Sequence, residues 1–138
     1  MEKEKIIQLI KEAQKASQFS YSPYSSFPVG AALLTKDGKI YTGTNVENCA
    51  YGLCVCAERI AIFKAVTEGN KDFEALAVVI PEKSPGYPSP CGSCRQVMAE
   101  FSLEMKVIMA KGEEDYQITT VKELLPWAFS PKNLDFEK

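Results

Sequence analysis

The five cysteines of this chain fall into two groups, each beside the start of a stretch with a helical pattern. The first group lies within residues 49–56, and the second consists of Cys91 and Cys94. The chain has no histidine, so thiolates and carboxylates are its candidate metal ligands. An odd number of grouped cysteines favours metal binding or catalysis over disulfides in a reducing compartment. If both groups serve one site, the fold must bring the starts of two helices together.

Patterns typical of helices and strands alternate along the chain. Apolar residues recur at helical spacing over 3–18, and two apolar runs within 29–46 flank Asp37-Gly38, which indicates a hairpin. The remaining elements are a helix over 56–69, a buried central strand over 74–81, a helix over 90–101, strands over 104–110 and 115–120, and a short helix over 120–129 that Pro126 ends. This order predicts a layered α/β sandwich with a mixed sheet, and the length of 138 residues predicts a single domain over 1–138.

Charge and hydropathy narrow the classes of partner. The net charge of −2 gives no overall attraction to phosphate backbones, so nucleic acid is not an expected partner. The charged opening "MEKEKIIQLIKEAQKA" lacks the pattern of a signal peptide, and no apolar run approaches the length of a membrane span. We therefore expect a cytoplasmic protein that does not bind membranes.

The cysteine spacing indicates a zinc site. Cys91-x-x-Cys94 has the spacing of a zinc knuckle, which needs at least one more ligand. Cys49, Cys54, Cys56 and carboxylates are the candidates, and Cys56 is the best because it begins the other helix. Three protein ligands leave a fourth position for water, as in catalytic zinc sites. We expect Cys49 and Cys54 to be small core residues.

Glu58 and two arginines complete the predicted chemistry. In the first turn of a helix, Glu58 can reach the same metal as Cys56, take a proton from water and pass it to a substrate nitrogen. Three thiolates on Zn²⁺ leave a net negative charge, which makes the water less acidic. The N-termini of the two helices, with Arg59 and Arg95 hydrogen-bonded to the thiolates, are expected to offset that charge.

Two other interpretations of the cysteines remain open. One is a structural zinc site with four cysteine ligands, in which Cys49 or Cys54 closes the shell. The other is a thioredoxin-like redox pair at Cys91 and Cys94. Both leave Glu58 without a role.

Longer motifs resemble a known family. "CAE" at 56–58 and "PCGSC" at 90–94 form the zinc-deaminase signature in its three-cysteine version. With "PYSSFPVGAAL", "NVENCAYGLCVCAERIAIFKAV", "SPCGSCRQVMAEF" and "ELLPWAF", the chain resembles the small homotetrameric zinc-dependent cytidine deaminases over residues 10–130. The resemblance implies a three-layer α/β/α sandwich with a mixed five-stranded sheet. It also implies a homotetramer whose active sites are completed by neighbouring subunits.

The resemblance implies a reaction and a site. The reaction is the hydrolytic deamination of cytidine and 2′-deoxycytidine to uridine and 2′-deoxyuridine, with release of ammonia, in pyrimidine salvage. The resemblance implies one Zn²⁺ per chain, with Cys56, Cys91 and Cys94 as its ligands, Glu58 as the proton carrier and Arg59 as the charge-compensating residue. For the substrate, it implies that Phe27 stacks on the pyrimidine, that Asn45 and Glu47 hydrogen-bond to the sugar 3′-hydroxyl, and that the Ala57 N–H donates to the 2-carbonyl. It also implies that Tyr51 and Phe129 make contacts across subunit interfaces.

From the residues alone, some of these side chains have simpler explanations. Phe27 fits a core side chain better, Asn45 and Glu47 fit surface polar residues, and Phe129 could pack on its own chain. Ile60 and Ala50 also depart from the residues usual in the family, without removing a ligand or the glutamate.

The alternative functions are deamination of another aminopyrimidine such as blasticidin S, action on cytidine within RNA, and a non-catalytic zinc-stabilised module. The motif "NVEN" argues against the first, because a ribose-binding motif has little purpose there.

Overall fold

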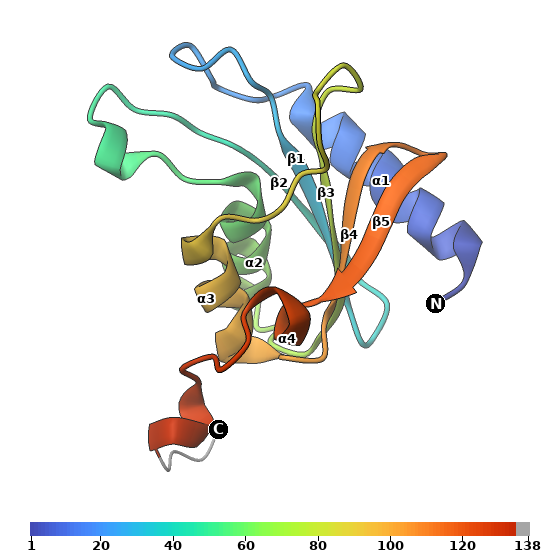
Figure 1. Cartoon of the computed structure of the whole chain (residues 1–138), viewed down its shortest axis with the longest axis vertical. Coiled ribbons are helices and arrows are strands. Elements are labelled where there is room, and N and C mark those ends of the chain that lie inside the picture. Colours follow the sequence, from blue (N-terminus) through green and yellow to red (C-terminus); the bar gives the residue numbers. More distant parts are fainter. Residues whose placement is uncertain (135–138) are drawn as a thin grey trace.

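A mixed five-stranded sheet forms the centre of the computed structural model, which describes residues 1–134 (Figure 1). The strands lie in the order β2-β1-β3-β4-β5, and only β3 and β4 pair in parallel. Their bounds are Gly30–Thr35 (β1), Ile40–Thr44 (β2), Phe73–Val79 (β3), Lys106–Gly112 (β4) and Asp115–Thr120 (β5). The predicted hairpin, the buried central strand and the mixed sheet are confirmed.

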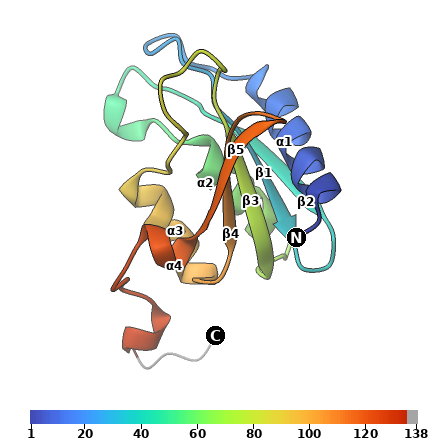
Figure 2. The same ribbon diagram turned by 45° about the vertical axis from the view of Figure 1, so that its right-hand side comes forward.

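Helices cover both faces of the sheet, which confirms the three-layer arrangement (Figure 2). One helix packs on one face and the others lie on the opposite side. The bounds are Lys3–Ser17 (α1), Ala57–Thr67 (α2), Gly92–Phe101 (α3) and Val121–Leu124 (α4), with short 3₁₀ helices at Tyr51–Leu53 (η1) and Pro131–Leu134 (η2). The helix expected over 120–129 is shorter than predicted, because Leu125 before Pro126 leaves the helical conformation.

The strand pattern explains the two cores. Side chains alternate between the faces of β1, so Leu33 packs into the core under α2 and α3, whereas Leu34 packs under α1. All six residues of β1 are buried, as expected for an inner strand covered on both faces. Leu9 and Ile10 of α1 are fully buried against this second face.

The register of the sheet brings the start of β1 and the ends of β2 and β3 to the same end of the sheet. Gly30 at the start of β1 pairs with both Thr44, at the end of β2, and Val79, at the end of β3. Three loops therefore run from the same end of the sheet, over residues 18–29, 45–56 and 80–91. The second and third of these loops lead directly into α2 and α3.

Within residues 1–134, no helix has the length and apolar character needed to cross a membrane.

Gly43 of β2 lies where α2 approaches the sheet most closely. A Cβ atom at this position would lie 2.6 Å from both the Ala57 carbonyl oxygen and the Ala61 nitrogen. Both atoms belong to the backbone of α2, so neither can move without shifting the helix. The absence of a side chain at Gly43 therefore allows α2 to pack this close to β2.

We predict that Gly43→Ala lowers the free energy of unfolding by about 1–3 kcal/mol, because the added methyl group overpacks this contact. Chemical denaturation measures the change. Gly52→Ala is the matched control, since a Cβ atom there meets nothing within 4 Å. Equal stability of the two variants would show that α2 is not held at this distance by Gly43.

Candidate metal centre and active-site cavity

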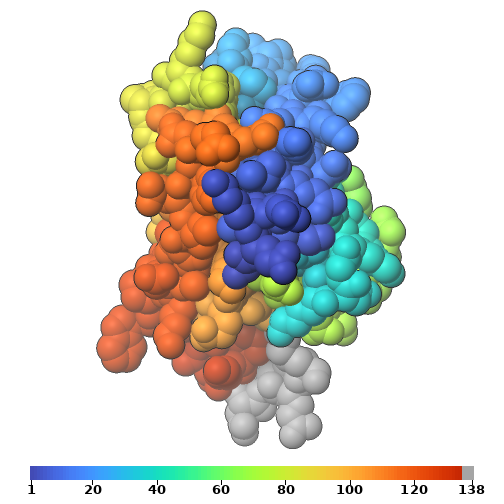
Figure 3. Space-filling view, turned by 90° about the vertical axis from the view of Figure 1, so that its right-hand side faces the viewer, coloured from blue at the N-terminus to red at the C-terminus, as the bar shows by residue number. Residues whose placement is uncertain are grey.

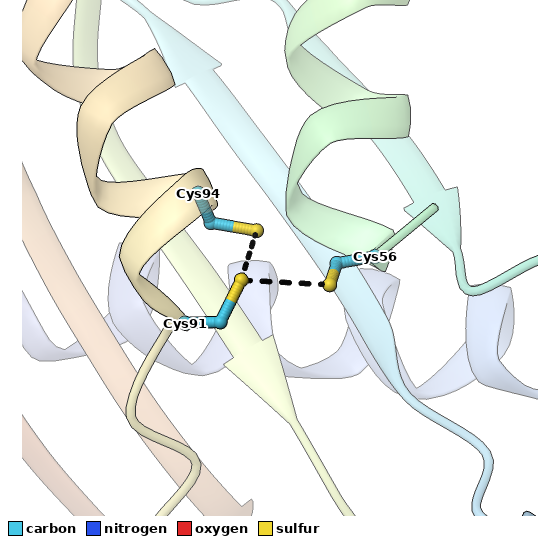
Figure 4. A group of neighbouring side chains, drawn as sticks. All are labelled: Cys56, Cys91 and Cys94. Carbon is cyan, nitrogen blue, oxygen red and sulfur yellow. Dashed lines mark hydrogen bonds between the residues drawn. The ribbon is translucent and has the colours of Figure 1, made fainter. Parts of the chain in front are cut away.

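Three thiols meet where the N-termini of α2 and α3 face each other (Figure 4). Cys56 is the N-cap of α2, Cys91 is the N-cap of α3, and Cys94 lies in the first turn of α3. The Cys56 and Cys91 sulfurs are 3.8 Å apart, the Cys91 and Cys94 sulfurs are 3.5 Å apart, and all three lie within 4.8 Å of one another. Tetrahedral zinc with Zn–S bonds of about 2.3 Å holds its sulfurs about 3.8 Å apart. The cluster therefore fits a zinc ion.

The other two cysteines stay outside this cluster. Cys49 is exposed and Cys54 is half-buried, so the expectation that both are core residues is wrong. They lie in the loop over 45–56, which extends from the sheet, and the Cys54 sulfur accepts a hydrogen bond from the Asn48 N–H at 3.3 Å. Among the described residues, the group able to hold a metal contains three cysteines and not four.

The cluster stabilises one thiolate without a metal ion, at Cys56. The hydrogen bond from Cys94, supported by Arg59, lowers the pKa of Cys56 to about 5. The Arg59 Nη2 lies 3.6 Å from the Cys56 sulfur, and this contact raises the pKa of Arg59. The hydrogen bond to Cys56, together with burial, raises the pKa of Cys94. Three thiolates therefore coexist here only when a metal ion neutralises them.

Arg95 does not act on the thiolates as predicted. Its Nε donates to the Pro90 carbonyl and its Nη1 to the Leu124 carbonyl, both at 2.7 Å, while Nη2 donates to the Ser89 hydroxyl. Successive helical residues point about 100° apart, so a residue next to Cys94 leaves the metal face. The guanidinium group instead joins the start of α3 to α4.

Glu58 is buried beside the thiols. Its side chain lies in the first turn of α2, and the residue is only 5% exposed. Burial raises the pKa of Glu58 to about 7, with a smaller contribution from Cys56. A carboxyl group in this range can accept and release a proton near neutral pH.

A cavity of about 390 Å³ opens next to the metal cluster. Cys56, Ala57, Glu58 and Cys91 line its metal end. The loops at the same end of the sheet supply other lining residues, which are Phe27, Val29, Asn45, Tyr87, Pro88 and Ser89. Phe27 is 39% exposed, so the explanation of Phe27 as a core side chain is wrong. The sequence analysis assigned no role to Tyr87, Pro88 and Ser89, although Ser89 begins the motif "SPCGSCRQVMAEF" and all three lie within four residues of Cys91.

Asn45 joins two parts of the cavity wall. Its Oδ1 accepts hydrogen bonds from the Ser20 hydroxyl at 2.6 Å and from the Val29 N–H at 3.0 Å. Its Nδ2 donates to the Phe27 carbonyl at 2.9 Å. An amide nitrogen carries two hydrogens, so one donor of Asn45 can still serve a ligand.

Glu47 orders the loop that carries Phe27. Its carboxylate accepts hydrogen bonds from the Ser25 hydroxyl and N–H and from the Tyr24 N–H, and these bonds lower the pKa of Glu47. Glu47 is not among the residues that line the cavity.

Tyr51 and Phe129 are not among the residues that line the cavity. Tyr51, in η1, is 71% exposed, and its ring makes an edge contact with Tyr24 at 5.6 Å between centroids. Phe129 is 59% exposed, and its carbonyl accepts a hydrogen bond from Gln96 at 2.8 Å. The structure of one chain therefore does not bring either ring to the site.

The chain is similar in sequence to known cytidine deaminases. Residues 3–111 match the family described as the cytidine and deoxycytidylate deaminase zinc-binding region. The chain is 53% identical over 129 residues to a cytidine deaminase of Sporosarcina psychrophila, covering 93% of each chain. It is 52% identical over 128 residues to the cytidine deaminase of Halalkalibacterium halodurans, covering 92% of this chain and 96% of that protein.

A solved structure shows the same likeness. The fold matches the crystal structure of cytidine deaminase from Burkholderia pseudomallei with a TM-score of 0.84 and 46% sequence identity. The match covers 88% of this chain and 97% of that one. From the cluster of three thiols, the matched zinc-binding region and these relatives, we conclude that the chain belongs to the cytidine deaminase family.

Proposed function

We propose that this chain catalyses the zinc-dependent hydrolytic deamination of cytidine to uridine, with release of ammonia. The observation that carries the proposal is the buried Glu58 carboxyl beside three thiols at one end of a cavity of about 390 Å³. The names of the similar proteins from Sporosarcina psychrophila and Halalkalibacterium halodurans support the choice of substrate.

Cys56, Cys91 and Cys94 are the proposed zinc ligands. When bound, zinc supplies Lewis acidity that makes water a nucleophile at neutral pH. Arg59 and the N-termini of α2 and α3 offset the negative charge of the thiolates. This compensation replaces what neutral imidazole ligands provide in other catalytic zinc sites.

Glu58 is the proposed proton carrier. Its carboxylate takes a proton from the attacking water and delivers it to N3 of the cytosine ring, and then transfers a proton to the amino group that leaves C4. The burial that raises its pKa to about 7 supports this role, because the same group must act as base and as acid.

The cavity suggests how a nucleoside is held. The Phe27 ring can stack on the pyrimidine, and the free amide hydrogen of Asn45 can bind a sugar hydroxyl. The Ala57 N–H, in the first turn of α2, is available for the 2-carbonyl oxygen. Glu47 retains a lone pair for the 3′-hydroxyl while it orders the Phe27 loop. Recognition of the 3′-hydroxyl accepts either sugar, so 2′-deoxycytidine is the second proposed substrate.

A homotetramer is proposed as the active assembly, in which Tyr51 and Phe129 contact the sites of neighbouring subunits. Their exposure in a single chain supports this assignment. The Arg59 Nε is buried and has no hydrogen-bond partner within residues 1–134, so a neighbouring subunit could supply one. A role in pyrimidine salvage in the cytoplasm is proposed as well, and the nucleoside substrate and the free cysteines support it.

Glu58→Gln is predicted to lower kcat for cytidine by about 10²–10⁴-fold, because the amide cannot carry the proton. Uridine and ammonia formation measures turnover, and metal analysis should show an unchanged zinc content. Glu68→Gln, at the exposed C-terminal end of α2, is the control and should keep full turnover. A Glu58→Gln enzyme with wild-type kcat would contradict the assigned role.

Removal of zinc with a chelator is predicted to abolish cytidine turnover, and added Zn²⁺ should restore it. Cys91→Ser should lose the metal, since it removes one of the three sulfurs. Cys49→Ser removes an exposed thiol outside the cluster and should retain both zinc and activity. Full turnover by the metal-free protein would rule out the zinc-dependent reaction.

Light scattering of the purified protein is predicted to give a mass of four times the 15.3 kDa chain. Exposed aromatic side chains such as Tyr51, at 71% exposure, should become buried in that assembly. A fully active monomer would contradict the proposal that neighbouring subunits complete each site.

A further inference from the structure

The loop between β3 and α3 forms part of the cavity wall through Tyr87, Pro88 and Ser89. The sheet register places this loop beside the turn between β4 and β5, since Val79 pairs with Ala110 and Ala110 pairs with Tyr116. In the space-filling view, the yellow atoms of the loop lie against the orange atoms of this hairpin (Figure 3). The hairpin itself contributes no residue to the cavity lining.

Two side chains of the hairpin hold the loop from outside the cavity. The Tyr87 hydroxyl donates a hydrogen bond to the Asp115 Oδ1 at 2.5 Å, and Asp115 is the first residue of β5. The Lys111 ammonium lies 5.2 Å from the centre of the Tyr87 ring and donates to the Ser84 carbonyl at 3.1 Å. We call Tyr87, Asp115 and Lys111 the hairpin latch.

The latch restrains a segment that has little structure of its own. The backbone hydrogen bonds inside the loop are short-range, from Ser84 to Pro81 and from Ser89 to Tyr87. Arg95 fixes only the end nearest α3, through Pro90 and Ser89. The middle of the loop therefore depends on its contacts with the hairpin.

The hydrogen bond also suits its partners chemically. Asp115 raises the pKa of Tyr87, which keeps the phenol protonated and able to donate. The Lys111 ammonium over the ring face adds a favourable cation–π contact. Tyr87 thus lines the cavity while its hydroxyl is bonded to the hairpin.

We propose that Tyr87 is a positioning residue of the substrate cavity and that Asp115 and Lys111 set its place, so that the β4–β5 hairpin determines how tightly the cavity closes on the nucleoside. This inference rests on the proposed function. The proposed reacting groups lie at the N-termini of α2 and α3, and no hydrogen bond found within residues 1–134 joins them to the hairpin latch. Loosening the latch should therefore weaken substrate binding and leave the chemical step unchanged.

The first test separates KM from kcat. Tyr87→Phe and Asp115→Ala each remove the hydrogen bond between these side chains, and each should raise KM for cytidine about three- to tenfold, with kcat within about twofold of wild type. The double variant should be no worse than Tyr87→Phe alone, because both substitutions remove the hydrogen bond between Tyr87 and Asp115. Glu114→Gln removes one negative charge from the same turn and should leave KM unchanged.

The second test does not need activity. Lys83 is an exposed trypsin site within the loop, followed by Ser84. Tyr87→Phe and Asp115→Ala should speed tryptic cleavage after Lys83, whereas Glu114→Gln should not, and mass spectrometry of the digest measures the rate. If the wild type fails to deaminate cytidine, the proposed function is wrong. The rate of cleavage after Lys83 then still tests whether the latch holds the loop.

Two results would overturn the proposal that the hairpin latch positions Tyr87. One is a wild type that deaminates cytidine, together with latch variants whose KM and Lys83 cleavage rate are both unchanged. The other is a lower kcat together with a lower melting temperature while KM stays unchanged. That result would mean that the contacts only stabilise the fold.

Discussion

The meeting of two helix N-termini at one end of the sheet is the constraint on which the site depends. The pairing of Gly30 with both Thr44 and Val79 sends the loops before α2 and α3 out from the same end. The two N-cap positions then hold Cys56 and Cys91 with their sulfurs 3.8 Å apart, at the spacing of a tetrahedral zinc site. The close approach of α2 to Gly43 fixes one half of this arrangement.

Charge is the second constraint, because a site of thiolates without histidine carries more negative charge than neutral ligands would give it. Arg59 contacts the Cys56 sulfur directly, and the helix N-termini add partial positive charge. Glu58 lies in the same turn, where burial favours its protonated form. One helix start therefore provides the proposed ligand, the proposed charge-compensating group and the proposed proton carrier within four residues, 56–59.

The sequence was informative where the chemistry is local and less so where it depends on tertiary contacts. The spacing of Cys91 and Cys94, and the place of Cys56 and Glu58 at a helix start, could be predicted because each depends on one turn of helix. Arg95 was misassigned, since its direction depends on the carbonyl groups of Pro90 and Leu124. Cys49 and Cys54 were wrongly expected to be buried, because no periodic pattern in the sequence shows whether a loop residue is exposed. Likewise, no motif pairs Tyr87 with a residue on β5.

The proposed zinc site has three cysteine ligands and one open position. X-ray absorption at the zinc edge of the purified protein tests it most directly. We expect three sulfur ligands at about 2.3 Å and one lighter atom. Four sulfur ligands would instead indicate a closed structural site, and would contradict the proposed roles of Glu58 and of the cavity beside it.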